Sequence, residues 1–262
     1  MKNPLPLCDF YAPNEASIEA LTADGLDLMT RRTAGTHAAF ALPLLRPGMR
    51  LLDCGCGPGS ITLGLAERVR PGGVIGVDYN GSLLDQANQA ATERGLNAAF
   101  LKGNVYELPF GAAEFDGVFS HALFEHLSRP TAALMELRRV MKPGAFIALR
   151  SPDWGGFVLD PWDGDVSAAI NAYRDLLVEN GSDVLAGRKL GAWLRATGFH
   201  HVTPSASYEI SPSTRLIADF IATQLEQNDQ QAGAFILREW ASQPGALFAQ
   251  SWFEAVGWKP WI

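Results

Sequence analysis

The stretch "LLDCGCGPGSITLGLAERV", residues 51–69, joins a short apolar run, three alternating glycines and a segment with helical periodicity. This order predicts a buried strand, a tight turn and a helix. Gly55, Gly57 and Gly59 let the main chain turn sharply and approach a ligand closely, and Ser60 can cap the helix that follows. A plain turn between a strand and a helix needs only one glycine. Three alternating glycines therefore indicate a turn that binds a ligand.

Strand and helix patterns continue outward from this turn, with short connections up to Arg150. The expected strands cover residues 49–54, 73–78, 98–103, 115–120, 144–150, 199–210 and 248–260. The expected helices cover residues 60–69, 82–95, 131–141, 166–181 and 188–198. Two more helices are expected within 213–243. The alternation predicts right-handed βαβ units and a parallel sheet covered on both faces.

Composition narrows the class of partner. The chain has 262 residues, 47% hydrophobic, and a formal net charge of −7 without a block of Lys or Arg. One elaborated soluble domain is expected, with a small-molecule partner and no nucleic acid, because the basic footprint of a nucleic-acid binder is missing. No window reaches the roughly 18 apolar residues of a membrane span and no signal peptide is recognisable, so a cytoplasmic location is expected.

Cysteine and histidine spacing does not indicate a metal site. Cys8, Cys54 and Cys56 are an odd set without CxxC spacing, and we expect them to pack as small apolar side chains. His200 and His201 are adjacent on an expected strand, so they point to opposite faces and cannot chelate one ion. No metal is expected.

The residues around the glycine turn indicate the chemistry of its ligand. A dinucleotide-binding turn has the spacing GxGxxG, whereas here Asp53 precedes glycines at alternate positions. A carboxylate there repels pyrophosphate and attracts an ammonium or sulfonium group. Asp78 ends the next strand and can accept the two hydroxyls of a ribose, and Tyr79 offers a flat face to a purine. Ribose, purine and a cationic amino-acid arm together describe S-adenosylmethionine.

Five ordered segments now carry a resemblance to a known family. They are "LLDCGCGPGS", "GVDYNGSLLDQA", "GNVYELPF", "FDGVFSHALFEHL" and "LRRVMKPGAFIALRSPDW". With them, residues 47–150 resemble a class I S-adenosylmethionine-dependent methyltransferase, similar to the group that includes the ubiquinone/menaquinone-biosynthesis C-methyltransferases. The resemblance implies a doubly wound, Rossmann-like α/β fold with seven strands in the order 3-2-1-4-5-7-6, the last strand antiparallel.

The resemblance also implies residues that bind the cofactor. Asp53 and the backbone of Gly55 and Gly57 would hold the methionine arm of S-adenosylmethionine. Asp78 would bind the ribose, and Tyr79 would cover one face of the adenine.

One of these positions departs from the family pattern. Asn104 stands where relatives usually have Asp; it keeps an acceptor oxygen, but its neighbours must orient the amide. The main-chain amide of Val105 would complete the adenine edge, and Ser120 and His121 would face the sulfur and the methyl group.

A general base is needed only when the methyl acceptor must lose a proton. His121, Glu125 and Asp153 are the catalytic candidates, because they follow the fourth and fifth expected strands. A base at His121 would titrate near the reference pKa of about 6.5. The alternatives are a wall of the cavity for His121 and a turn or capping role for Asp153, while His126 is expected to be structural.

Segments outside the motifs should select the acceptor. We expect residues 1–46 to form an N-terminal helical lid and residues 47–262 the methyltransferase domain. Cap insertions are expected at about 152–185 and 213–243. Arg32 or Thr33 would reach the cofactor carboxylate from the lid; alternatively, Arg31 and Arg32 lie on a solvated helix face. An aromatic pocket or a plain core is expected from Trp154, Phe157, Trp162 and Trp240.

The sequence thus predicts transfer of a methyl group from S-adenosylmethionine to a small, partly apolar or aromatic metabolite. A tRNA or protein methyltransferase is the alternative within the enzymes, and the acidic net charge disfavours RNA. A noncatalytic protein that binds S-adenosylmethionine or S-adenosylhomocysteine is the alternative from another class. An NAD-dependent dehydrogenase is disfavoured by the glycine spacing.

Overall fold

Seven strands form one mixed sheet in the computed structural model, which describes residues 23–211 and 213–261. The strands are β1 (Arg50–Cys54), β2 (Gly73–Asp78), β3 (Ala98–Lys102), β4 (Phe115–His121), β5 (Met141–Asp160), β6 (His200–Ile210) and β7 (Leu247–Trp258). They pair in the order β3-β2-β1-β4-β5-β7-β6, and β7 is antiparallel to β5 and β6. The predicted doubly wound α/β fold and its strand order are confirmed.

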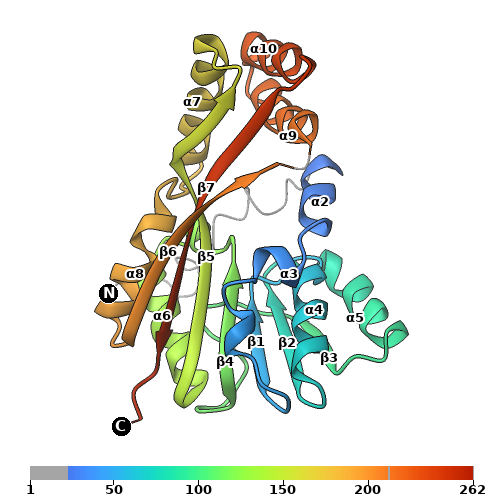
Figure 1. The fold of residues 1–262 in the computed structure, drawn as a ribbon. Coiled ribbons are helices and arrows are strands. Elements are labelled where there is room, and N and C mark those ends of the chain that lie inside the picture. The colour runs from blue at the N-terminus through green and yellow to red at the C-terminus, as the bar shows by residue number, and fades with distance from the viewer. Residues whose placement is uncertain (1–22, 212, 262) are drawn as a thin grey trace, which may run out of the picture.

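Helices cover both faces of this sheet (Figure 1). One face carries α3 (Ala34–His37), α4 (Ser60–Val69) and α5 (Leu84–Glu93), and the other carries α6 (Pro130–Val140) and α8 (Ala186–Ala196). Successive side chains on a strand point to opposite faces, so Leu51 packs in one core and Leu52 in the other. Short 3-10 turns lie at η2 (Leu42–Leu44), η3 (Gly81–Leu83) and η4 (Phe124–His126).

The fifth strand is longer than its sequence pattern predicts. Residues 144–150 were expected to form it, but β5 continues to Asp160 because its far half pairs with the start of β7. The pairing skips residues between Asp153 and Phe157, where the register shifts. The first part of the expected cap insertion at 152–185 is therefore strand, since an antiparallel partner satisfies its backbone hydrogen bonds.

A third apolar core lies at the end of these long strands. Helices α7 (Gly164–Glu179), α9 (Thr214–Glu226) and α10 (Gln231–Ala241) gather there, above the body of the sheet (Figure 1). The core contains Ile170, Ile221 and Leu237, one from each helix, together with Phe248 of β7. The two helices predicted between 213 and 243 are thus present.

The N-terminal segment is described from residue 23 onward. Helix α2 (Ala23–Thr30) lies between the glycine turn and α9 (Figure 1), and the Ser60 hydroxyl donates to the Met29 carbonyl at 3.1 Å. Residues 1–22 of the predicted lid, which include Cys8, lie outside the described residues. Within the described part of the chain, no helix has the length and apolar character that crossing a membrane requires.

Candidate active site

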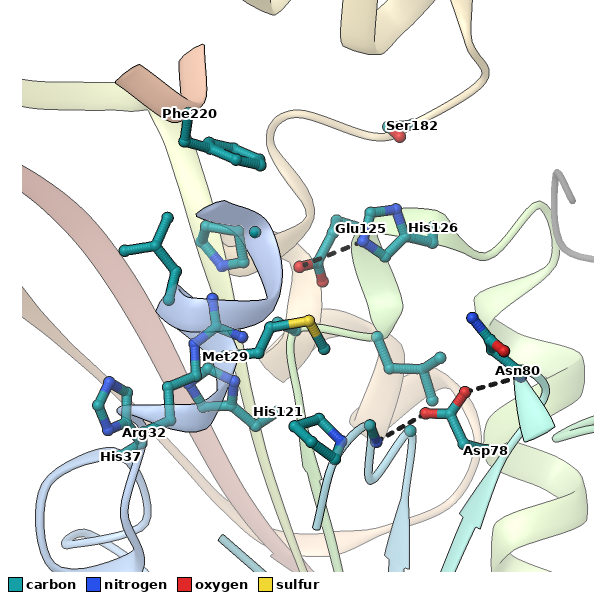
Figure 2. Close-up of a pocket in the computed structure, with 18 of the residues that line it drawn as sticks. Met29, Arg32, His37, Asp78, Asn80, His121, Glu125, His126, Ser182 and Phe220 are labelled. Carbon is teal, nitrogen blue, oxygen red and sulfur yellow. Dashed lines mark hydrogen bonds and ion pairs between the residues drawn. The ribbon is translucent and has the colours of Figure 1, made fainter. Parts of the chain in front are cut away.

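A cavity of about 650 Å³ lies at the carboxyl ends of the parallel strands, below α7 and α9. Most of the residues singled out in the sequence line it: Arg32, Asp53, Gly55, Gly57, Asp78, Tyr79, Asn104, Val105, His121 and Glu125. Ser120 and Asp153 do not line it. Figure 2 shows Arg32 and His121 on one side of the cavity and Asp78 on the other. The fold therefore brings together residues separated by more than ninety positions in the sequence.

The glycine turn has a conformation that side chains would prevent. Gly55 and Gly57 have φ values of +78° and +51°, which L residues rarely adopt. A Cβ atom on Gly55 would lie 3.0 Å from the Cβ atom of Leu123. The Gly57 amide donates to Asp78 Oδ2 at 2.8 Å, so the carboxylate of β2 holds the turn after β1 in place.

Asp78 accepts from backbone amides and still faces the cavity. Besides Gly57, the Asn80 amide donates to Asp78 Oδ1 at 2.9 Å (Figure 2). Burial raises the pKa of Asp78 above its ordinary value, against the opposing effect of these donors.

Asp53 is the most deeply buried acid of the cavity wall, with 2% of its surface exposed. The Thr62 hydroxyl of α4 donates to Asp53 Oδ2 at 2.6 Å. Burial raises the pKa of Asp53 to about 7, although this hydrogen bond favours the ionised form. A cation arriving beside Asp53 would therefore find a carboxyl group poised to ionise.

The side-chain amide of Asn104, which follows β3 and lines the cavity, is held in one orientation. The Tyr106 amide donates to Asn104 Oδ1 at 3.0 Å, which supplies the orientation that the sequence required of its neighbours. The carbonyl oxygen keeps a second lone pair and the NH₂ group keeps its donors. Tyr79 has the Lys102 ammonium 5.5 Å from its ring centroid.

A charged network lies at the opposite wall, and sequence reasoning had singled out only Arg32 among its members. Arg150 is 4% exposed and donates to Glu209 Oε2 at 2.8 Å, while His37 Nε2 lies 3.1 Å from Glu209 Oε1. The guanidinium carbon atoms of Arg32 and Arg150 lie 5.7 and 4.5 Å from the Trp252 ring centroid. The residues come from α3, β5, β6 and β7, so no local spacing could have indicated the network.

This network changes the interpretation of His121. Arg150 Nη1 lies 3.1 Å from His121 Nε2, so the ring nitrogen accepts from a guanidinium group. Burial, reinforced by Arg32 and Arg150, holds the pKa of His121 well below 6.5. The expected titration near 6.5 is therefore wrong, and the geometry favours the alternative that His121 is a neutral wall of the cavity.

Asp153 and Ser120 are placed away from the cavity surface. Asp153 is fully buried, and Arg188 of α8 donates to both carboxylate oxygens, at 2.5 and 2.7 Å. The Gly155 amide also donates to Asp153 Oδ1, which is the turn role considered as the alternative. Ser120 is 1% exposed, and its hydroxyl has no partner among the described residues.

Glu125 is the remaining candidate base and it lines the cavity. It lies in η4 directly after β4 and is 7% exposed. The Ser151 hydroxyl donates to Glu125 Oε2 at 2.9 Å, whereas Oε1 lies 3.9 Å from His126 Nε2 (Figure 2). One carboxylate oxygen is thus held by β5 and the other remains able to accept a proton.

The two alternatives for the four aromatic residues divide between them. Trp154 lines the cavity, Trp240 lies in the cap core and Phe157 packs against that core, whereas Trp162 is 75% exposed and fits neither alternative. Trp162 follows the end of β5, where no helix covers it. Aromatic residues that the sequence analysis missed complete the cavity wall: Tyr173, Phe220, Phe248 and Trp252. Alternation along the last strand was the available signal for Phe248 and Trp252.

Comparison with known proteins places this geometry in a family. A profile described as a methyltransferase domain matches residues 52–149. The demethylmenaquinone methyltransferase of Thermus thermophilus is 32% identical over 212 residues, which cover 76% of this chain and 91% of that relative. The chain belongs to the S-adenosylmethionine-dependent methyltransferases.

Other relatives of this chain differ from it in length. An uncharacterized methyltransferase of Schizosaccharomyces pombe is 35% identical over 169 residues, 62% of this chain and 60% of that relative, so the chain spans about three fifths of its length. The solved phosphoethanolamine N-methyltransferase 2 of Haemonchus contortus, in complex with S-adenosylhomocysteine, has a TM-score of 0.64 and 16% identity. The superposition covers 99% of this chain and 62% of the solved chain, and it shows that the fold is shared.

Proposed function

We propose that this chain binds S-adenosylmethionine in the cavity and transfers its methyl group to a small, partly apolar or aromatic metabolite. The observation that carries the proposal is a single cavity with two unlike halves. Asp53 and Asp78 lie in the half beside the glycine turn, and Trp154, Tyr173 and Phe220 line the half beneath the cap. One half thus suits a charged nucleoside and the other suits an apolar acceptor.

The residues present fit the cofactor. Asp53 would bind the ammonium group beside Gly55 and Gly57, and Asp78 would accept from the ribose hydroxyls. Asn104, Val105 and Tyr79 would surround the adenine at the end of β2 and β3, and Ser120 would lie behind the methyl group. Arg32 would face the cofactor carboxylate; its guanidinium already lies over Trp252 and points into the cavity in Figure 2.

S-adenosylmethionine supplies a sulfonium methyl group, so the acceptor atom forms a bond to carbon while the bond between sulfur and carbon breaks. The protein's part is to hold the acceptor in line and to exclude water. When the acceptor is a phenol or another group that must lose a proton, Glu125 Oε1 would take it, because Glu125 is a cavity carboxylate that Ser151 orients.

The two cap segments, 152–185 and 213–243, and the N-terminal lid would close over the acceptor. Phe220 and Tyr173 reach the cavity from α9 and α7, while α2 spans from the glycine turn towards α9. Methyl transfer needs a cavity poor in water, and such covering elements are drawn from less stable parts of a fold.

The test is to incubate the protein with methyl-labelled S-adenosylmethionine and a metabolite extract, and to identify labelled products by mass spectrometry. We expect a labelled small molecule with an apolar or aromatic skeleton. Label in tRNA or protein would instead support those substrate classes. Stoichiometric binding of S-adenosylhomocysteine without any labelled product would contradict catalysis and favour a noncatalytic binder.

The buried carboxyl of Asp53 predicts a pH-dependent affinity. Its pKa of about 7 means that the ligand-free protein is largely protonated there below pH 7. Because a bound ammonium group favours the ionised form, binding then releases a proton. The affinity for S-adenosylhomocysteine should fall by up to about tenfold per pH unit below 7 and level off above it. Calorimetry across this range measures the slope.

Asp53→Asn is the control for this slope. The variant should bind more weakly at pH 8 and lose the dependence on pH around 7. A slope that survives in the variant would assign the titration to another group, of which Asp78 is the next to test, because burial raises its pKa as well.

Hydrogen exchange tests the covering role of α2 and α9. Both helices contribute residues to the cavity, among them Met29 and Phe220, whereas α10 contributes none among the described lining residues. S-adenosylhomocysteine should slow exchange in α2 and, when the acceptor product is also bound, in α9. Exchange in α10 serves as the internal reference. Equal exchange in α2 with and without ligand would show that it is an ordinary packing element.

A further inference from the structure

One polar side chain of the cavity wall has no role in the proposal above. Gln250 lies on β7, lines the cavity and is only 7% exposed. Its Nε2 atom is buried and has no hydrogen-bond partner among the described residues. A buried donor without a partner is costly, so native proteins rarely keep one unless a ligand or an ordered water molecule completes its hydrogen bonding.

The strand pattern explains why this amide points inward. Phe248, Gln250 and Trp252 alternate along β7 and all three line the cavity. Side chains two apart on a strand share a face, so the row reads apolar, polar and aromatic. An apolar side chain at the middle position would leave no buried polar atom without a partner. Gln250 therefore differs from its two aromatic neighbours on this face of β7.

Its strand partners do not use the amide. Gln250 pairs across the sheet with Glu209 on β6 and Phe157 on β5. The two oxygens of Glu209 already have partners, His37 on one and Arg150 on the other. Both oxygens of this carboxylate are thus engaged by His37 and Arg150, and the NH₂ group of Gln250 has no partner on the neighbouring strands.

Gln250 lies between an aromatic part and a charged part of the cavity wall. On one side the ring of Phe248 lies 6.5 Å from Trp154, within the aromatic half. On the other side the Trp252 ring is covered by the guanidinium groups of Arg32 and Arg150 and lies 4.9 Å from His121. A ligand ring beside Phe248 would place a substituent at Gln250, at the border between the apolar and charged halves.

We propose that Gln250 determines acceptor specificity by donating a hydrogen bond to an oxygen atom on an otherwise apolar ring. The inference rests on the proposed function, since it requires that the acceptor enters this cavity. The oxygen is a carbonyl, hydroxyl or ether group, because the orphaned atom is a donor and its partner must accept. A pure hydrocarbon would leave the amide unpaired and bind less tightly.

A matched pair of probes tests this assignment. 1-Tetralone and tetralin share one bicyclic skeleton and differ by a carbonyl oxygen that can only accept hydrogen bonds. Their affinities are measured by quenching of tryptophan fluorescence, with S-adenosylhomocysteine bound, in the wild type and in Gln250→Met. Methionine keeps a similar volume and removes the donor.

The expected result is a change in the ratio of the two affinities. The wild type should prefer 1-tetralone, and the preference should fall at least tenfold in Gln250→Met, roughly the effect of one buried hydrogen bond. Gln250→Glu, which replaces the donor by an acceptor, should lose the preference as well. Gln243→Met, the same change at an exposed position outside the cavity, should keep it.

Stability separates recognition from a structural role. Because the amide has no partner in the protein, Gln250→Met should unfold at the same or a higher temperature than the wild type and keep its affinity for S-adenosylhomocysteine. A lowered unfolding temperature would indicate a structural hydrogen bond and overturn the proposal. An unchanged ratio of affinities, or no binding of either probe to the wild type, would overturn it too. None of these measurements depends on methyl transfer, so failure of the proposed activity remains distinguishable.

Discussion

Asp78→Ala is expected to weaken binding of S-adenosylhomocysteine at least about a hundredfold. In the proposed binding mode, the variant would lose two charge-assisted hydrogen bonds to the ribose, each contributing about 1.5–3 kcal/mol. It also loses the acceptor for the Gly57 amide, which orients the glycine turn, and for the Asn80 amide. Calorimetry at pH 8, where Asp53 is mostly ionised, measures the change without the additional proton release.

Asp85→Ala is the matched control, since it removes an exposed carboxylate from the first turn of α5, close in sequence to Asp78. Its affinity should stay within about twofold of the wild type, as screened surface charges contribute little. Circular dichroism and thermal unfolding of both variants check that the turn remains folded. An Asp78→Ala protein that folds and binds with nearly unchanged affinity would move the ribose site elsewhere.

Glu125→Gln is expected to lower kcat by about 10² to 10⁴ when the acceptor must be deprotonated. The amide keeps the shape of the carboxyl group and can still accept from Ser151, but it cannot take a proton. Affinity for S-adenosylhomocysteine should remain nearly unchanged, because a base acts in the transition state. Single-turnover rates with the acceptor identified by labelling measure the effect.

Two further variants show whether the effect belongs to Glu125. His121→Asn should reduce kcat much less than Glu125→Gln, because the lone pair of His121 Nε2 already accepts from Arg150. Ser151→Ala should cause an intermediate loss, since it removes a hydrogen bond that orients the carboxylate. If Glu125→Gln retains the wild-type rate while His121→Asn loses it, the assignment of the base reverts to the histidine.

The half of the cavity beside the glycine turn could be predicted because its signals are local. Asp53, the glycines and Asp78 sit at the ends of consecutive strands, and the ends of neighbouring parallel strands meet at one edge of a sheet. Hydrophobic periodicity and glycine spacing were sufficient to predict α4 over residues 60–69 and β2 over residues 73–78, whereas the correct strand order came from the family resemblance.

The half of the cavity beneath the cap could not be predicted in this way. Phe220, Trp252 and Glu209 meet Arg32 in one cavity although the chain between them is long. The apolar pattern of the cap helices is the same whether they cover a core or a ligand, so spacing alone did not separate Trp154, which lines the cavity, from Trp162, which is exposed.

By itself, the sequence determined the order of the sheet, the turn that suits a nucleoside with a cationic arm, and the family. Only the tertiary structure distinguished the surroundings of the three candidate bases: Asp153 is bound by Arg188, His121 accepts from Arg150, and Glu125 lines the cavity. The physical reason is that strand and turn propensities act between near neighbours in the chain. Protonation and hydrogen-bond capacity instead depend on burial and on charged partners that folding brings from distant positions.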